Sequence, residues 1–389
     1  MAAELTAFRR DLHAHPELAG AEHRTTGAVA DRLTAAGVAV TKLPGTGLLA
    51  DLGAEHAAYR VALRADLDAL PVTERTGLPW ASTADGVSHA CGHDLHTTAL
   101  LGAGLALHQQ HRELTRRGLA VRLVFQPAEE VIPGGAHTAI ESGALFGVDR
   151  IFALHADPTI DAGKVGLREG AITSAADSVL VTLTGQGGHT SRPHLTQDLV
   201  FALAKVATEV PGVLSRRLDP RAGAALVWGS IHAGSARNVI PGTGVLGGTL
   251  RVLDADAWAQ MEGVVEQVVQ AVAAPYAVTA HVDHVRGVPP VVNRHDCLEV
   301  LRLATEAVLG HDADVGTQQS LGGEDYAWYL REVPGALLRL GTRTPGGPTY
   351  DLHQGDLVVD EEAVGIGAGL LAATAVLASG VPTAVGSGR

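Results

Sequence analysis

The sequence predicts an α/β fold, in which a larger domain with a mostly parallel mixed sheet flanked by helices carries an inserted α+β domain. The chain has 389 residues, more than the ~250–300 at which one hydrophobic core stops growing. In the first part of the chain, short apolar strands alternate with helical segments, as they do in parallel sheets. From residue 176 the order becomes β-α-β-β-α-β, which is typical of a ferredoxin-like domain.

The larger domain begins with apolar residues at helical spacing from Glu4 to Leu33, interrupted near His15 and Pro16. Its further elements are, in order, a strand from Tyr59, a helix beginning near Leu95, strands over Leu119–Phe125 and Arg150–Leu154, and a closing helix over Glu361–Ala378. Strand composition and turn residues delimit each of them.

Three of these strands end in side chains that can carry chemistry. Asp66 and Asp68 end the first, Glu129 and Glu130 follow the second, and His155 follows the third. In open α/β sheets, functional groups gather beyond the carboxyl ends of the strands. The pattern therefore predicts an active site along one edge of the sheet.

The inserted domain has the alternating pattern of half-exposed strands between amphipathic helices. Its expected elements are a strand over Asp177–Thr184, a helix over Gln197–Val210, strands over Ala224–His232 and Thr243–Leu253, a helix over Ala257–Val272 and a strand over Val278–Val285. We therefore expect residues 1–175 and 287–389 to form one domain and residues 176–286 to form the other.

Composition excludes several classes of partner. The formal net charge of −13 argues against nucleic acid, which needs a clustered basic surface. The sequence shows no apolar run of ~18 residues and no signal-peptide core at its start, so we expect a cytoplasmic protein without a membrane partner. The two cysteines, Cys91 and Cys297, are expected to be reduced there.

The segment His89–His96 places a thiol, three imidazoles and a carboxylate within eight positions. If its backbone is extended, Cys91 and His93 point to the same side, because strand side chains alternate. The plainer alternative is that Asp94 caps the following helix and the histidines are incidental. In another alternative, Cys91 is a nucleophile with His93 as its base, although a spacing of two residues makes that geometry awkward.

Adjacent carboxylates on non-helical backbone diverge, so one of Glu129 and Glu130 can bind a metal while the other faces a water. Five potential metal ligands then stand in the sequence: Cys91, His93, Glu130, His155 and His353. Five are too few for two closed tetrahedral sites, but they suit two metal ions that share a bridging ligand and a water.

Seven motifs follow one another through the chain: HACGHDLH, QPAEE, LHADP, GQGGHTSRPH, NVIP, GGEDYAWY and YDLH. In this order they resemble the M20 metallopeptidase family, and more narrowly its amidohydrolase branch of hippurate hydrolases, N-acyl amino acid amidohydrolases and indole-acetyl amino acid hydrolases. The resemblance extends from Arg9 to about Gly369. One departure is the closing motif, which reads Leu-His-Gln-Gly-Asp in this chain. The family usually has a small residue, a proline and an aromatic residue after this histidine.

The resemblance implies that the five residues named above bind two divalent ions per subunit, of zinc, manganese, cobalt or nickel. It implies that Glu129 is the general base and acid. Asp66 aligns with an aspartate that orients a ligand in other branches, but Arg64 stands where those branches have a histidine ligand. Glu324 of the GGEDYAWY motif receives no catalytic role, and a structural anchor for the pocket is the plainer interpretation.

From the inserted domain, the resemblance implies that His189 stabilises the oxyanion in a neighbouring subunit's site. It implies that Asn238 lies nearby and that Arg251 holds the substrate carboxylate; His194 is a rival for His189. The inserted domain would act as a lid and in dimerisation, giving a homodimer or higher homo-oligomer.

The function that the resemblance implies is metal-dependent hydrolysis of the amide bond of N-acyl amino acids, such as hippurate-like or acetyl amino acids. A dipeptidase or carboxypeptidase of the same family is the alternative within hydrolases. A non-catalytic protein that binds small molecules is the alternative outside them, and it predicts a missing ligand or base. The sequence lacks none of them.

Overall fold

The computed structural model describes residues 2–382, which divide into two compact units. Unit 1 consists of the described residues up to Ile172, of Val291–Gln318 and of those from Asp325 onward. Unit 2 consists of Thr173–Pro290 and Gln319–Glu324. The first predicted domain also includes residues 1 and 383–389, which lie outside the described residues. The lid and dimerisation role of the inserted domain stays a prediction.

Unit 1 contains a seven-stranded mixed sheet in the order β1-β2-β4-β3-β5-β15-β6. Its strands are β1 (Val40–Lys42), β2 (Leu48–Gly53), β3 (Tyr59–Asp66), β4 (Leu119–Gln126), β5 (Arg150–Asp161), β6 (Val165–Gly166) and β15 (Gly335–Arg343). The four central strands are parallel, and the outer ones pair antiparallel. The prediction of a mostly parallel mixed sheet flanked by helices is confirmed.

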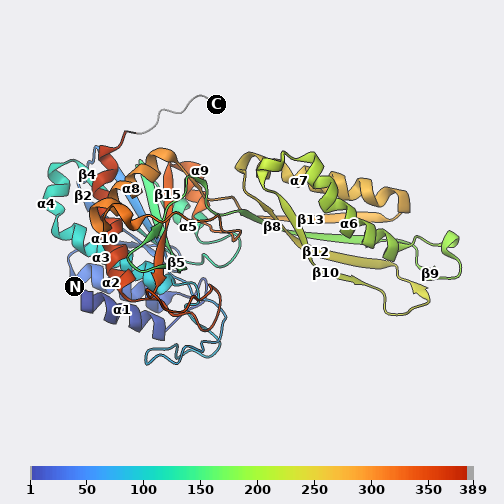
Figure 1. The fold of residues 1–389 in the computed structure, drawn as a ribbon, viewed down its shortest axis with the longest axis horizontal. Coiled ribbons are helices and arrows are strands. Elements are labelled where there is room, and N and C mark those ends of the chain that lie inside the picture. Colours follow the sequence, from blue (N-terminus) through green and yellow to red (C-terminus); the bar gives the residue numbers. More distant parts are fainter. Residues whose placement is uncertain (1, 383–389) are drawn as a thin grey trace. The chain divides into compact units, whose positions relative to one another are not determined.

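Helices cover both faces of this sheet (Figure 1). They are α1 (Ala2–Ala14), α2 (His23–Ala35), α3 (His93–Gln109), α4 (His111–Arg116), α5 (Ala136–Glu141), α8 (His295–Leu309), α9 (Ala327–Glu332) and α10 (Glu362–Leu377). Because strand side chains alternate, Val61 and Leu63 of β3 pack in the core with α1, α3, α8 and α10, whereas Ala62 packs in the core with α5 and α9. Burial on both faces explains why these strands are almost continuously apolar.

Helix α10, with the residues that follow it to Gly380, is long and apolar enough to cross a membrane by length and composition alone. Half of this segment is buried within the protein, where α10 packs against α3 and α8. Gly367 allows this close packing, because a Cβ there would lie 3.0 Å from Leu340 and 3.1 Å from Ala99. We therefore interpret α10 as a core helix.

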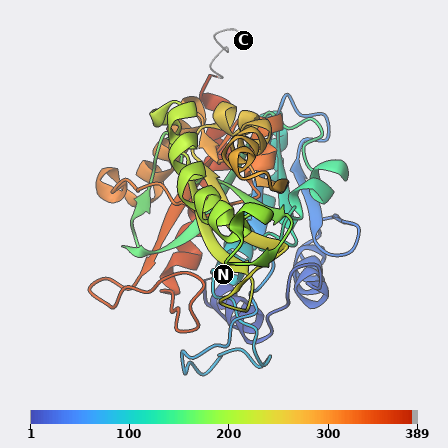
Figure 2. The same cartoon turned by 90° about the vertical axis from the view of Figure 1, so that its right-hand side faces the viewer.

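Unit 2 has the predicted β-α-β-β-α-β order. Its elements are β8 (Ala175–Thr184), α6 (Leu199–Arg217), β10 (Ala225–Ala233), β12 (Thr243–Val252), α7 (Ala255–Ala273) and β13 (Thr279–Val288). The strands form an antiparallel sheet in the order β10-β12-β8-β13, the ferredoxin-like arrangement. Helices α6 and α7 pack on each other and on this sheet (Figure 1 and Figure 2). The side chains of Asp198 and Asp254 cap them by accepting backbone N–H groups.

Several short elements complete the described chain. Two-stranded pairs join β9 (Gly188–His189) to β11 (Val239–Ile240) and β7 (Gly170–Ala171) to β14 (Val292–Asn293). Short 3-10 helices occupy Pro193–Leu195, Pro220–Ala222, Ala274–Tyr276, His311–Ala313 and Ala378–Gly380.

Two local expectations were wrong. The segment before α3 is not extended, because Gly92 has φ 85° and caps a helix that begins at His93 rather than near Leu95. Asp94 is therefore inside the first turn and is not the cap. Strand β5 continues to Asp161, so His155 lies within the strand, paired with Arg339, instead of following its end. Parallel pairing with β15, with one irregularity between Gly341 and Arg343, extends the strand beyond its apolar run.

A buried guanidinium joins the ends of the central strands. Arg64, 1% exposed, donates to Asp66 at 2.7 Å, to Asp325 at 2.7 Å and to the Gln126 side-chain oxygen at 2.9 Å. The amide of Gln126 in turn donates to both oxygens of Asp325, at 2.9 and 2.7 Å. One positive charge thus compensates two buried carboxylates beside the strand ends.

We predict that Arg64→Ala lowers the free energy of unfolding by about 3–5 kcal/mol, because it leaves two buried carboxylates without their cation. Arg60→Ala is the matched control. Arg60 lies on the same strand, but its partner Asp51 is 49% exposed, so we expect a loss of about 1 kcal/mol or less. Urea denaturation of both variants measures the difference, and equal losses would contradict the prediction.

Candidate metal centre

All five predicted ligands converge in unit 1. Cys91 forms one group with His93 and His155, and another with Glu130 and His353; the donor atoms of each group lie within 4.8 Å of one another. The Cys91 sulfur is 3.6 Å from Nε2 of His155, and Nε2 of His353 is 3.3 Å from Oε1 of Glu130. Cys91 belongs to both groups, as a donor shared by two ions would.

Hydrogen bonds on the far sides of the rings decide which histidines offer a lone pair to this centre. Nδ1 of His155 lies 2.8 Å from the carbonyl oxygen of Ala156 and donates to it, which leaves Nε2 as the acceptor facing Cys91. His96 differs, because Nδ1 donates to Asp66 at 2.6 Å and Nε2 accepts the N–H of Ala156 at 2.8 Å. Both nitrogens of His96 are occupied, so it supports the site without binding a metal.

The donor atoms fit a pair of divalent ions. Nε2 of His93 and Oε1 of Glu130 are buried, 3.8 Å apart, and without a hydrogen-bond partner in the described part of the chain. Leaving such buried polar atoms unsatisfied costs about 1–3 kcal/mol each. Sulfur, imidazole and carboxylate donors together suit zinc and similar first-row ions.

The Cys91 thiol is a poor nucleophile on its own. Burial raises the pKa of Cys91 to about 12. At neutral pH the thiol is therefore protonated unless a cation stabilises the thiolate, and the thiolate is the reactive form. This argues against the nucleophile alternative and agrees with a metal-ligand role.

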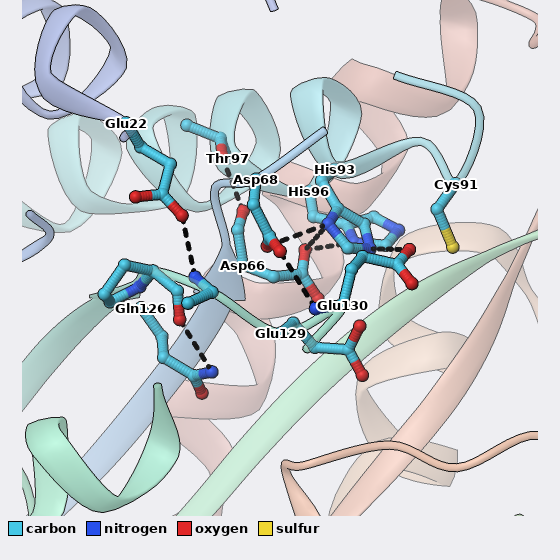
Figure 3. A network of polar contacts seen from close by, with 12 residues as sticks. Glu22, Asp66, Asp68, Cys91, His93, His96, Thr97, Gln126, Glu129 and Glu130 are labelled. Atoms are coloured by element: carbon cyan, nitrogen blue, oxygen red, sulfur yellow. Dashed lines mark hydrogen bonds and ion pairs between the residues drawn. The ribbon is translucent and has the colours of Figure 1, made fainter. Parts of the chain in front are cut away.

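The loop that carries Glu129 and Glu130 has an unusual backbone. Ala128 has φ 55°, and among the described residues only Ala277 and His353 share such a left-handed conformation without being glycine. The buried Glu22 accepts the N–H of Ala128 at 2.8 Å and so holds the loop (Figure 3). Strained backbone of this kind is common where a site needs a fixed direction for its side chains.

Glu129 lies beside the ligand groups, half-buried. Its carboxylate, with His93 and Glu130, forms a further group of donors within 4.8 Å of one another. The backbone N–H of Asp325 donates to Oε1 of Glu129 at 3.4 Å. The sequence led us to expect that these two adjacent carboxylates diverge, but an oxygen of each lies within 4.8 Å of the other and of His93.

Sequence reasoning missed the role of Asp68. The resemblance offered Asp66 as an acid that at best orients a ligand, and its oxygens bond His96 at 2.6 Å and Arg64 at 2.7 Å. Asp68 instead lies with one oxygen 3.4 Å from Nδ1 of His93, while the other accepts the N–H of Glu130 at 2.9 Å. The only signal in the sequence was a second acid two residues beyond Asp66.

The predicted residues of the inserted domain separate into two places within unit 2. His189 and Asn238 lie close together, because His189 pairs with Val239 and the N–H of Thr190 donates to the carbonyl of Asn238 at 3.1 Å. Arg251 is near the opposite end of β12, about 26 Å along the strand from Thr243 at ~3.3 Å per residue.

Two further residues that the sequence singled out, His194 and Glu324, also lie in unit 2. His194 is exposed in the short helix Pro193–Leu195. Glu324 is buried, with 3% of its surface exposed. Separately, the side chain of Arg251 donates a hydrogen bond to the carbonyl oxygen of Leu321.

Comparison with known proteins places this geometry in a family. A model described as peptidase family M20/M25/M40 matches residues 62–376. The chain belongs to the M20 family. Its structure superposes on that of a Bacillus subtilis protein described as a dinuclear metal-binding peptidase of the M20 family, with TM-score 0.84 and 32% identity over 97% of this chain and 98% of that one. This M20 chain is therefore a hydrolase of amide bonds with a binuclear metal centre.

Two relatives of this M20 chain differ in how much of their own length the match covers. N-acetyl-L-cysteine deacetylase of Bacillus subtilis is 37% identical, over 93% of this chain and 85% of its own length. A Rhodococcus jostii protein named putative glutamate–cysteine ligase 2-3 is 51% identical over 93% of this chain. The M20 chain spans only 45% of that longer relative.

A second buried ionic network supports the start of α3, the helix that carries His93. Asp94 accepts from Arg9 at 2.7 Å and from His13 at 2.9 Å, and His13 also faces Glu74 at 3.2 Å. Burial lowers the pKa of His13, but the charge and hydrogen bond of Asp94 and the hydrogen bond of Glu74 outweigh burial and raise the pKa to about 9. Both ring nitrogens then donate to carboxylates.

This raised pKa predicts a pH dependence of stability. The protonated His13 stabilises the fold fully below its unfolded pKa of 6.5, and the contribution disappears as pH rises through about 9. Relative to His13→Gln, the wild-type protein should be more stable by about 3 kcal/mol at pH 6, and this margin should vanish by about pH 10. Denaturation across that range measures it, with the exposed His15→Gln as control. A margin that does not change with pH would contradict the assignment.

Proposed function

We propose that this M20 chain hydrolyses the amide bond of small N-acyl amino acids. The observation that carries the proposal is the convergence of five metal-binding side chains beside one further carboxylate, Glu129. In this proposal Cys91, His93, Glu130, His155 and His353 hold the two ions. Zinc, manganese, cobalt and nickel all suit the donor set.

Glu129 moves the proton in the proposed mechanism. A pair of divalent ions supplies a Lewis acid for the scissile carbonyl and lowers the pKa of a water to ~7. Glu129 accepts the proton that this water loses as its oxygen attacks the carbonyl carbon. As the carbon–nitrogen bond breaks, Glu129 delivers the same proton to the leaving nitrogen, so that a carboxylic acid and an amine result.

Residues of unit 2 complete the site in the proposal. A donor imidazole on His189, with Asn238 beside it, stabilises the negative charge that develops on the carbonyl oxygen. Arg251 binds the substrate carboxylate, for which a guanidinium is well suited. Thr243, which follows the strand that pairs with His189, lies ~26 Å along β12 from Arg251, and this length exceeds the size of an acyl amino acid. We therefore propose that His189 serves the site of a second copy of the chain, as the predicted homodimer requires.

The acyl group is proposed to be small, with an N-acetyl amino acid as the first candidate. The support is the relative at 37% identity, which is named for deacetylation of N-acetyl-L-cysteine. That match covers 93% of this chain and 85% of the relative, so the likeness includes both units.

A panel assay tests the proposal. We expect purified enzyme to release free amino acid from acetyl-, benzoyl- or indole-acetyl-amino acids, N-acetylcysteine among them, faster than it cleaves dipeptides. Chelation of the metals should abolish the activity, and their return should restore it. Preferential cleavage of dipeptides would favour the dipeptidase or carboxypeptidase alternative. No hydrolysis of either class by metal-loaded protein would refute the proposal.

Glu129→Gln provides the matched control for the same assay. It should keep both metal ions but lower turnover by about 10²- to 10⁴-fold, because only the proton transfer is lost. Full activity in this variant would show that another group is the base.

A mixing experiment tests the role of His189. Glu129→Gln and His189→Ala should each be nearly inactive alone. If His189 acts in the neighbouring subunit, a mixed dimer regains one complete site, so random re-association of equal amounts should restore about a quarter of the wild-type activity. If His189 acts within its own subunit, no mixed dimer contains a complete site and the mixture stays inactive.

A further inference from the structure

We propose that Glu22 is a positioning residue that holds the backbone from which the proposed base, Glu129, extends. The inference rests on the base assignment of the proposed function and adds to it a residue from a distant part of the sequence. Glu22 is buried, with 0% of its surface exposed, and its carboxylate accepts the N–H of Ala128 at 2.8 Å (Figure 3). Ala128 immediately precedes Glu129 in the chain.

The side chain of Glu22 does not serve its own helix. Glu22 occupies the N-cap position of α2, where a side-chain oxygen commonly accepts an N–H of the first turn, but it makes no such bond. Glu17 takes that role and accepts the N–H groups of Arg24 and Thr25 at 2.9 and 2.7 Å. The carboxylate of Glu22 is therefore available to the loop after β4.

Two further donors fix the direction of this carboxylate. The N–H of Gly20 donates at 2.9 Å to Oε1, the same oxygen that accepts the N–H of Ala128. The hydroxyl of Thr46 donates to Oε2 at 2.6 Å. Buried polar atoms need such partners, because an unsatisfied one is costly. The segments around α2 and β2 thus orient the carboxylate of Glu22 independently of the loop that it holds.

The turn beside Thr46 also packs against the start of this loop. A Cβ at Gly47 would lie 2.7 Å from the carbonyl oxygen of Phe125 and 2.7 Å from Cδ of Pro127. The N–H of Gly47 donates to the hydroxyl of Thr26 in α2 at 2.8 Å. The backbone of the turn therefore lies directly on the chain that leads from β4 to Ala128.

The loop itself needs this support. Ala128 has the left-handed φ of 55°, a conformation that persists in a non-glycine residue only when surrounding contacts impose it. Its carbonyl oxygen accepts the N–H of Gly135 at 2.9 Å, and a Cβ at Gly135 would lie 1.9 Å from the carbonyl oxygen of Pro127. With its N–H on Glu22 and its carbonyl on Gly135, Ala128 is held from both sides and directs the next residue, Glu129.

Turnover tests the inference. We expect Glu22→Ala to lower kcat about 10- to 100-fold with little change in KM, because a shift of ~1 Å in a reacting group can cost ~10²-fold in rate. Metal content should stay at the wild-type level, because the N–H of Glu130 is held separately by Asp68 at 2.9 Å. Glu22→Gln, which keeps an acceptor oxygen for Ala128, should restore most of the rate.

A double variant shows whether Glu22 acts through Glu129. Two residues that act as a unit have effects on rate that are not additive. In the Glu129→Gln background, Glu22→Ala should therefore lower the residual kcat by about twofold at most. A full 10- to 100-fold loss in that background would mean that Glu22 acts on another group, and the inference would be overturned.

Glu17→Ala is the matched control. Glu17 also accepts two backbone N–H groups beside α2, but none of its hydrogen bonds in the described chain reaches the loop after β4. This variant should lose stability and keep the wild-type kcat. Thermal unfolding separates a loss of folding from a loss of rate. Glu22→Met, which fills a similar space without a carboxylate, carries the test if Glu22→Ala does not fold.

The outcomes distinguish this inference from the proposed function. If Glu129→Gln is inactive and a folded Glu22→Ala or Glu22→Met keeps the wild-type kcat, the positioning role is refuted and the proposed function stands. If Glu129→Gln keeps full activity, or if the metal-loaded wild-type protein hydrolyses no amide, the base assignment fails and the inference fails with it.

Discussion

Buried charge beside the carboxyl ends of β3 and β4 must be neutralised, and much of unit 1 is arranged around this constraint. Arg64 meets it on one side, where it compensates Asp66 and Asp325. On the other side, Cys91 shares one group of donor atoms with His93 and another with Glu130, and Glu130 also contacts the imidazole of His353 at 3.3 Å. In the proposed function, divalent ions would compensate these groups as Arg64 compensates its carboxylates. The two halves of the network share β3, so the fold and the centre depend on one another.

The centre also shows how a supporting residue differs from a ligand of the same type. His96 and His155 are near neighbours, with ring centroids 4.9 Å apart. Both contact the backbone of Ala156, His155 through its carbonyl and His96 through its N–H. These two hydrogen bonds leave a free lone pair on His155 and none on His96. The direction of the surrounding backbone, and not the residue type, thus assigns each role.

Much of the fold could be predicted from the sequence, because apolar periodicity and acids at strand ends are patterns among neighbouring residues and can be recognised without knowledge of tertiary contacts. The mixed sheet is an example, and so is the set of potential ligands drawn from distant motifs. The prediction of an extended backbone at Cys91 was wrong, because Gly92 adopts a left-handed conformation that the motif alone does not specify. Asp68 and Asp66 are equivalent in the sequence. Only the tertiary contacts of Arg64 and His96 show which of them is left to face His93.

The left-handed backbone at Ala128 and His353 has a consequence for protein engineering. Each such residue costs on the order of 1–3 kcal/mol, which the contacts around it must offset. Screens for heat-resistant variants tend to select changes that relieve such strain, and relief here would loosen the directions in which the neighbouring side chains point. Thermostabilising this enzyme without loss of rate therefore calls for changes far from these two loops, in the cores of the two units.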